Sequence, residues 1–211
     1  MQTNEIIEKA EEFCKKHNLT GYPVKIVDLC LAEDIQVFER YLPEEVSGFI
    51  VIQEEVFDGY GTGRLIVVNL ADSPRRRRFT IAHELAHYIL HKDENLSYYA
   101  HRDAGQNGGD EKEANLFASN VLMPHTFVNE CVERLGEPPQ YLLIDYVADK
   151  FAVSKDAAQV RLSQLFPKIC RCGRKSRRFR CSLRRRRMTS LSRFSFGSLS
   201  DIGTCPPARS G

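Results

Sequence analysis

The chain has 211 residues, of which 42% are hydrophobic and 27% are charged, and its formal net charge at pH 7 is +2. This composition is that of a water-soluble globular protein, and the length provides one ordinary domain plus an extension. No apolar run approaches the ~20 residues of a membrane-spanning helix, and the acidic first residues do not resemble a signal peptide, so we expect a cytoplasmic protein with no membrane partner.

Charge is divided unevenly along the chain. Residues 168–211 contain 13 Lys and Arg against the single acid Asp201, whereas the first 167 residues contain 17 basic and 27 acidic side chains. The split predicts an acidic folded domain over 1–166 and a basic tail over 167–211, which lacks apolar periodicity and is expected to be disordered. Such a tail could bind nucleic acid through phosphate contacts. We favour instead an extension without a function or a shifted reading frame, so no nucleic-acid partner is expected.

The first elements alternate between helix and strand patterns. Apolar residues at helical spacing predict a helix over 4–17 and a short one over 23–31, which begins at a proline. Three apolar runs follow at 35–38, 46–52 and 65–69, and a glycine-rich segment between the last two predicts a turn. These runs predict a small, mostly antiparallel sheet.

The rest of the folded part is predicted to be helical. Ser73 and the following proline mark the start of a central helix that runs to about His91. After a loop at 92–109, a second strong helix spans 110–123, and two or three more helices follow. The last two, within 142–166, form a helical pair. The predicted fold class is therefore α+β, with a helical body beside the small sheet.

Residues 83–87 read HELAH, an HExxH pattern within the central helix. Residues four apart lie one above the other on a helix face, so His83 and His87 can both reach one Zn²⁺ at about 2.0–2.1 Å. Glu84 then projects between solvent and metal, where it can take a proton from a water molecule. The alternative is an amphipathic helix with two histidines at the edge of its apolar stripe. The pattern favours a zinc site with Glu84 as the general base, in a zincin-like helical body.

A carboxylate on the following helix is the candidate third ligand. Glu113 occupies the centre of a stripe that is expected to be buried, and a buried charge is unfavourable unless a cation or a buried arginine pairs with it. A helical glutamate about 25 residues after HExxH is typical of gluzincins. The other members of the stripe are Leu116, Phe117, Asn120 and Met123.

His91 continues the series of histidines on the central helix. With a rise of about 1.5 Å per residue, His83 and His91 lie roughly 12 Å apart along the axis, which is too far for one tetrahedral ion. We therefore expect His91 to be a residue of the helix C-terminus, where the helix dipole favours an imidazole.

Three segments, in order, resemble the ImmA/IrrE-type metallopeptidases: a strand ending in VN, an RFT-x-AHE-x-x-H helix, and an E-A-N-x-F-A helix ending in LMP. The resemblance covers about residues 4–166. It implies that His83, His87 and Glu113 hold zinc and that Glu84 is catalytic. It also implies an endopeptidase whose substrate is a helix-turn-helix transcriptional repressor.

A second function is suggested by the helical pair at 142–166, which resembles a helix-turn-helix and carries Lys155, Gln159 and Arg161 on its second helix. The alternative to the peptidase is therefore a DNA-binding regulator with a structural zinc. Structural zinc sites have four protein ligands and catalytic sites three, and only three good ligands are present. This count favours the enzyme.

Two groups of residues near the motif helix keep more than one interpretation. The four arginines at 75–78 form either a solvated helix entrance or a surface for an acidic or nucleic-acid partner. In the loop that follows the helix, one side chain could stabilise the oxyanion of a tetrahedral intermediate. The loop candidates are Tyr98, Tyr99, His101 and Arg102.

Overall fold

The computed structural model describes residues 1–52, 63–91, 109–136 and 138–167, which belong to one compact unit. In these ranges no helix is both long and apolar enough to cross a membrane. Helices dominate beside one small sheet, which confirms the predicted α+β class. The elements are α1 (Thr3–Lys16), α2 (Ile26–Ala32), β1 (Gln36–Arg40), β2 (Gly48–Ile52), β3 (Arg64–Asn69), α3 (Pro74–His91), α4 (Asp110–Leu122), α5 (His125–Leu135), α6 (Gln140–Phe151) and α7 (Lys155–Leu165).

The sheet is mixed, with the strand order β1-β3-β2. Ile66 at its centre pairs with Val37 of β1 in parallel and with Ile50 of β2 in antiparallel register. The expected, mostly antiparallel sheet therefore has one parallel pairing. β1 and β2 are the two edge strands, and β3 lies between them. β3 runs parallel to β1 and antiparallel to β2. Nearly all of the predicted turn before β3 and the tail from residue 168 onward lie outside the described residues.

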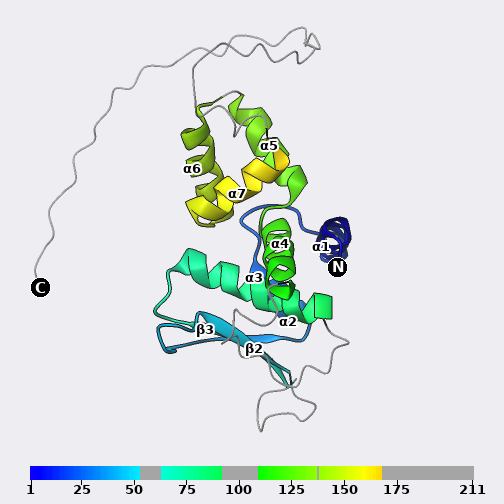
Figure 1. Cartoon of the computed structure of the whole chain (residues 1–211), viewed down its shortest axis with the longest axis vertical. Coiled ribbons are helices and arrows are strands. Elements are labelled where there is room, and N and C mark those ends of the chain that lie inside the picture. The colour runs from blue at the N-terminus through cyan, green and yellow to red at the C-terminus, as the bar shows by residue number, and fades with distance from the viewer. Residues whose placement is uncertain (53–62, 92–108, 137, 168–211) are drawn as a thin grey trace, which may run out of the picture. The chain divides into compact units, whose positions relative to one another are not determined.

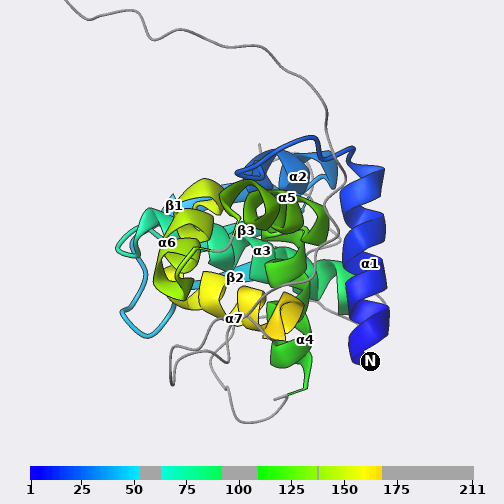
Figure 2. The ribbon, with the colours of Figure 1, turned by 90° about the horizontal axis from the view of Figure 1, so that it is seen from above.

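Helices cover one face of the sheet in successive layers (Figure 1). The motif helix α3 packs on β2 and β3, and α4 packs on the side of α3 away from the sheet. From above, α1 lies along α4 (Figure 2). Because α4 is covered by both α3 and α1, more than one of its faces is buried. Fully buried residues from these layers include Ile66, Leu85 and Phe117.

β2 approaches α3 closely at Gly48. A Cβ atom there would lie 2.6 Å from Cγ2 of Thr80 and 2.8 Å from the carbonyl oxygen of Val67, so one of the two elements would have to move. We expect Gly48→Ala to destabilise the protein by about 1–3 kcal/mol, as overpacking typically does. Thermal denaturation checks this, with Gly21→Ala as control because nothing lies within 4 Å of that position. Equal melting temperatures of the two variants would contradict the close packing.

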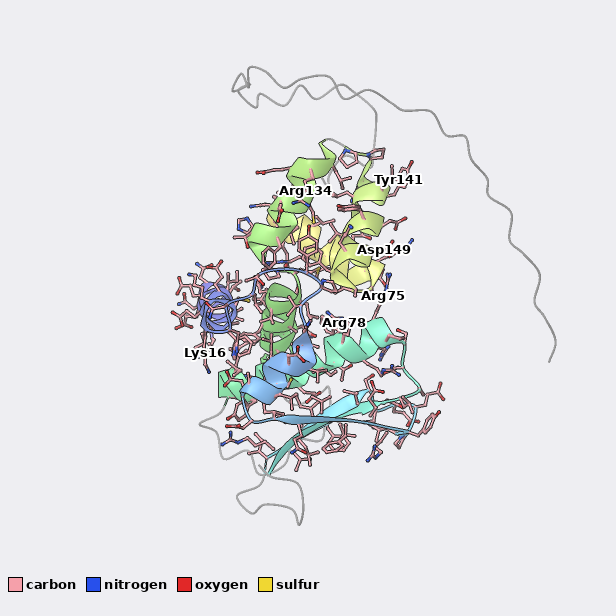
Figure 3. All side chains as sticks on the ribbon, turned by 180° about the vertical axis from the view of Figure 1, so that it is seen from behind. Lys16, Arg75, Arg78, Arg134, Tyr141 and Asp149 are labelled. Carbon is pink, nitrogen blue, oxygen red and sulfur yellow. The ribbon has the colours of Figure 1, made fainter. Side chains whose placement is uncertain are left out.

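The arginines at the start of α3 attach the helix to its surroundings (Figure 3). Arg75 donates to the carbonyl of Val153 at 3.1 Å and pairs with Asp149 at 2.6 Å. Arg78 donates to the carbonyl of Val24 at 2.8 Å. Arg76 and Arg77 likewise have intramolecular partners, namely Ser47, Asp72, Leu70 and Glu39. These contacts favour a structural role over a binding surface.

The helical pair α6 and α7 does not present all the residues expected of a DNA reader. Arg161 is 3% exposed, and its Nε donates to the carbonyl of Met123 at 3.1 Å, just beyond the end of α4. Burial lowers the pKa of the Arg161 guanidinium to about 10. This side chain satisfies a terminal helix carbonyl inside the protein and is not available to nucleic acid.

Candidate metal centre

The two histidines of the HExxH pattern lie on the face of α3 that meets α4. His87 is 1% exposed and Glu84 is 2% exposed, while His83 is partly buried. The helix begins as predicted, because Oγ of Ser73 accepts the backbone N–H of Arg76 at 3.3 Å, the bond expected of an N-cap. The i, i+4 spacing then places the two imidazoles together, with ring centroids 4.8 Å apart.

Ligand atoms of three residues converge between the two helices. Nε2 of His83 lies 3.1 Å from Nε2 of His87 and 3.2 Å from Oε2 of Glu111. Nε2 of His87 lies 3.6 Å from Oε1 of Glu111. Atoms bound to a tetrahedral zinc ion at about 2.0–2.1 Å lie roughly 3.3 Å from one another. The three donors therefore fit one zinc ion by both chemistry and spacing.

Asn115 holds one of the imidazoles in the required orientation. Its Oδ1 lies 3.1 Å from Nδ1 of His83. An amide oxygen can only accept, so Nδ1 carries the proton and Nε2 keeps its lone pair for a metal ion. Glu111 and Asn115 are four residues apart and share one face of α4. That i, i+4 relation is the sequence signal that could have identified both residues.

The third ligand predicted from the sequence lies elsewhere. Glu113 forms an ion pair with the amino group of Met1 and is grouped with His91 and Asp110, whereas Glu111 contacts both motif histidines. The prediction of Glu113 as a ligand rests on the expected burial of its side chain, which is inferred from the spacing of apolar residues along the helix. Because α4 is buried by α1 as well as by α3, burial does not show which face meets the histidines. The geometry thus favours Glu111 over the predicted Glu113.

Glu84 is a buried carboxylate beside this centre. Burial, together with the negative charge of Glu111, raises the pKa of Glu84 to about 8, although a hydrogen bond from the backbone N–H of Ile50 acts in the opposite direction. Its Oε2 has no hydrogen-bond partner within the described ranges. A cation at the three donors would favour the ionised form and leave Oε2 free to accept a proton. The four loop residues considered for oxyanion stabilisation lie outside the described residues.

Comparison with known proteins gives consistent matches. Residues 30–163 match the family model of the IrrE N-terminal-like domain. The radiation response metalloprotease IrrE of Deinococcus radiodurans is 34% identical over 109 residues, which cover 49% of this chain and only 32% of that protein. The metallopeptidase ImmA of Bacillus subtilis is 22% identical over 160 residues, covering 76% of this chain and 85% of that protein.

A solved structure shares the fold. A transcriptional regulator of Mycobacterium tuberculosis aligns with a TM-score of 0.52 and 20% sequence identity, covering 76% of this chain and 46% of that chain. At this identity the likeness concerns the fold alone.

Proposed function

The chain belongs to the IrrE N-terminal-like family, whose model matches residues 30–163, and on that premise we propose that it is a zinc-dependent, gluzincin-like endopeptidase of the cytoplasm. The family relatives named above are metallopeptidases, which supports the reaction class. The observation that carries the proposal is the convergence of His83, His87 and Glu111 at distances of 3.1 to 3.6 Å beside the buried Glu84.

The residues of the site have separate roles in peptide hydrolysis. A bound zinc ion supplies Lewis acidity, which polarises the scissile carbonyl and lowers the pKa of the attacking water. Glu84 accepts the proton of that water at Oε2, for which the described residues supply no hydrogen-bond partner, and later donates it to the leaving amine. Asn115 keeps the His83 ring in one tautomer and one orientation. Glu84 is buried, and the interaction of its carboxylate with a bound cation is stronger there than it would be in water.

The identity of the third ligand can be tested by a pair of variants on α4. We expect Glu111→Ala to lower zinc affinity at the HExxH site and peptidase activity by at least ~100-fold, since loss of even an outer-shell partner costs about 10–100-fold. Glu113→Ala serves as the matched variant and should reduce activity far less. Zinc titration and a peptidase assay measure both effects. A larger loss in Glu113→Ala would restore the assignment made from the sequence.

We propose a helix-turn-helix transcriptional repressor as the substrate, which the sequence resemblance supports. A peptidase that acts among folded cytoplasmic proteins must be selective. Cleavage in an exposed linker or near the oligomerisation helix would separate the two DNA-binding units and weaken binding to paired half-sites. Incubating the zinc-loaded protein with the repressor encoded beside it should give one cut, and Glu84→Gln should abolish that cut. Degradation of casein while the repressor stays intact would reject the substrate.

The alternative, a DNA-binding regulator with a structural zinc, has less support. In the described ranges three protein donors meet at the HExxH site, whereas structural zinc sites take four. Arg161, one of the three side chains expected to read DNA, is buried.

A further inference from the structure

A second group of metal-ligand side chains lies next to the first, where the end of α3 meets the start of α4 (Figure 1). It consists of His91, the last residue of α3, together with Asp110 and Glu113 in the first turn of α4. One ligand atom of each residue lies within 4.8 Å of the others. The peptidase proposed above uses none of these three side chains.

Two buried atoms of this group lack partners. His91 is 7% exposed, and its Nε2 has no hydrogen-bond partner in the described part of the chain; the same holds for Oε2 of Glu113. Among the described residues, neither Asp110 nor Glu113 forms an ion pair with His91, although one ligand atom of each of the three residues lies within 4.8 Å of the others. A buried polar atom left unpaired is energetically unfavourable. Because these ligand atoms lie within 4.8 Å of one another, small side-chain movements would bring all three residues into contact with one ion.

The electrostatic surroundings favour a cation. Two carboxylates face the C-terminal end of α3, where the helix dipole also favours positive charge. The amino group of Met1 already pairs with Oε1 of Glu113, and this hydrogen bond, together with the negative charges of Glu113, Glu5 and Asp110, raises the pKa of the amino group. The site therefore attracts positive charge, and Oε2 of Glu113 has no hydrogen-bond partner among the residues that the structure describes.

We propose that His91, Asp110 and Glu113 bind a second divalent transition-metal ion, with Zn²⁺ as the representative ligand. An imidazole with two carboxylates suits zinc or a similar metal, whereas magnesium and calcium take oxygen ligands. The site lies about one helical turn beyond His87, whose ring centroid is 5.8 Å from that of His91. The ion joins the end of α3 to the start of α4 and thereby supports the helix that carries Glu111.

Zinc stoichiometry of the full-length protein tests this site. After saturation with Zn²⁺ and removal of free metal, we expect two zinc ions per chain in the wild type, one in Asp110→Asn, one in His87→Ala and none in the double variant. Asp110→Asn is preferred to a His91 substitution because Asp110 is partly exposed and its loss should not prevent folding. Asp156→Asn, in the first turn of α7, is the matched control and should keep two ions.

The outcomes separate this site from the peptidase centre. One zinc ion in the wild type, lost in His87→Ala and retained in Asp110→Asn, would overturn the second site and leave the proposed function intact. One zinc ion lost in Asp110→Asn and retained in His87→Ala would support the second site and contradict the peptidase centre. A 100-fold excess of Mg²⁺ should not displace the zinc that depends on Asp110; displacement would overturn its assignment as a transition-metal site.

Discussion

Replacement of Glu84 by glutamine is expected to lower the rate of peptide-bond hydrolysis by about 10²–10⁴-fold, the usual contribution of a general base, while zinc content stays unchanged. The amide has nearly the same shape but cannot accept the proton of the attacking water. Glu84 is 2% exposed and is not one of the three grouped ligands, so the metal centre should remain.

The control for this variant is Glu133→Gln, which changes an exposed carboxylate on α5 in the same way. Melting temperatures should show that both variants fold, because a neutral amide at position 84 avoids the desolvation that raises the pKa of the native carboxyl. Hydrolysis by Glu84→Gln at a rate close to that of the wild type would place the general base elsewhere.

Replacement of His87 by alanine is expected to remove one zinc ion per chain and to reduce peptidase activity to background. The imidazole is 1% exposed, and its Nε2 lies within 3.1 to 3.6 Å of the other two donors, so its loss leaves two ligands in an enlarged cavity. We expect zinc affinity to fall by more than ~100-fold, because loss of an outer-shell partner alone costs about 10–100-fold.

His125→Ala provides the matched comparison, because His125 is exposed at the start of α5 and bonds only Asn129 in the described part of the chain. It should keep full zinc content and activity. The measurement is metal analysis of both variants beside a peptidase assay. Unchanged zinc in His87→Ala, or equal losses in the two variants, would contradict the metal centre.

The sequence predicted the motif helix well because its signals are local. Ser73 as N-cap, the i, i+4 histidines and the apolar stripe depend only on helical geometry, and the structure shows a helix over Pro74–His91 with these features. The family was predicted from three motifs in order and is confirmed by the match over residues 30–163.

What the sequence did not predict depends on which elements lie side by side. Periodicity placed Glu113 on a buried face, but the face that meets His83 belongs to Glu111, because α1 and α3 both cover α4. The parallel pairing of β1 with β3 likewise follows from strand order, which no local pattern records. The buried position of Arg161 depends on the distant carbonyl of Met123.

The central claim is that two helices hold one catalytic ion between His83, His87 and Glu111. A crystal structure of the zinc-loaded protein, with anomalous diffraction recorded at the zinc edge, tests it directly. We expect an anomalous peak about 2.0–2.1 Å from Nε2 of both histidines and from a carboxylate oxygen of Glu111. The absence of a peak at that position, or a peak there bound by Glu113 in place of Glu111, would contradict the account.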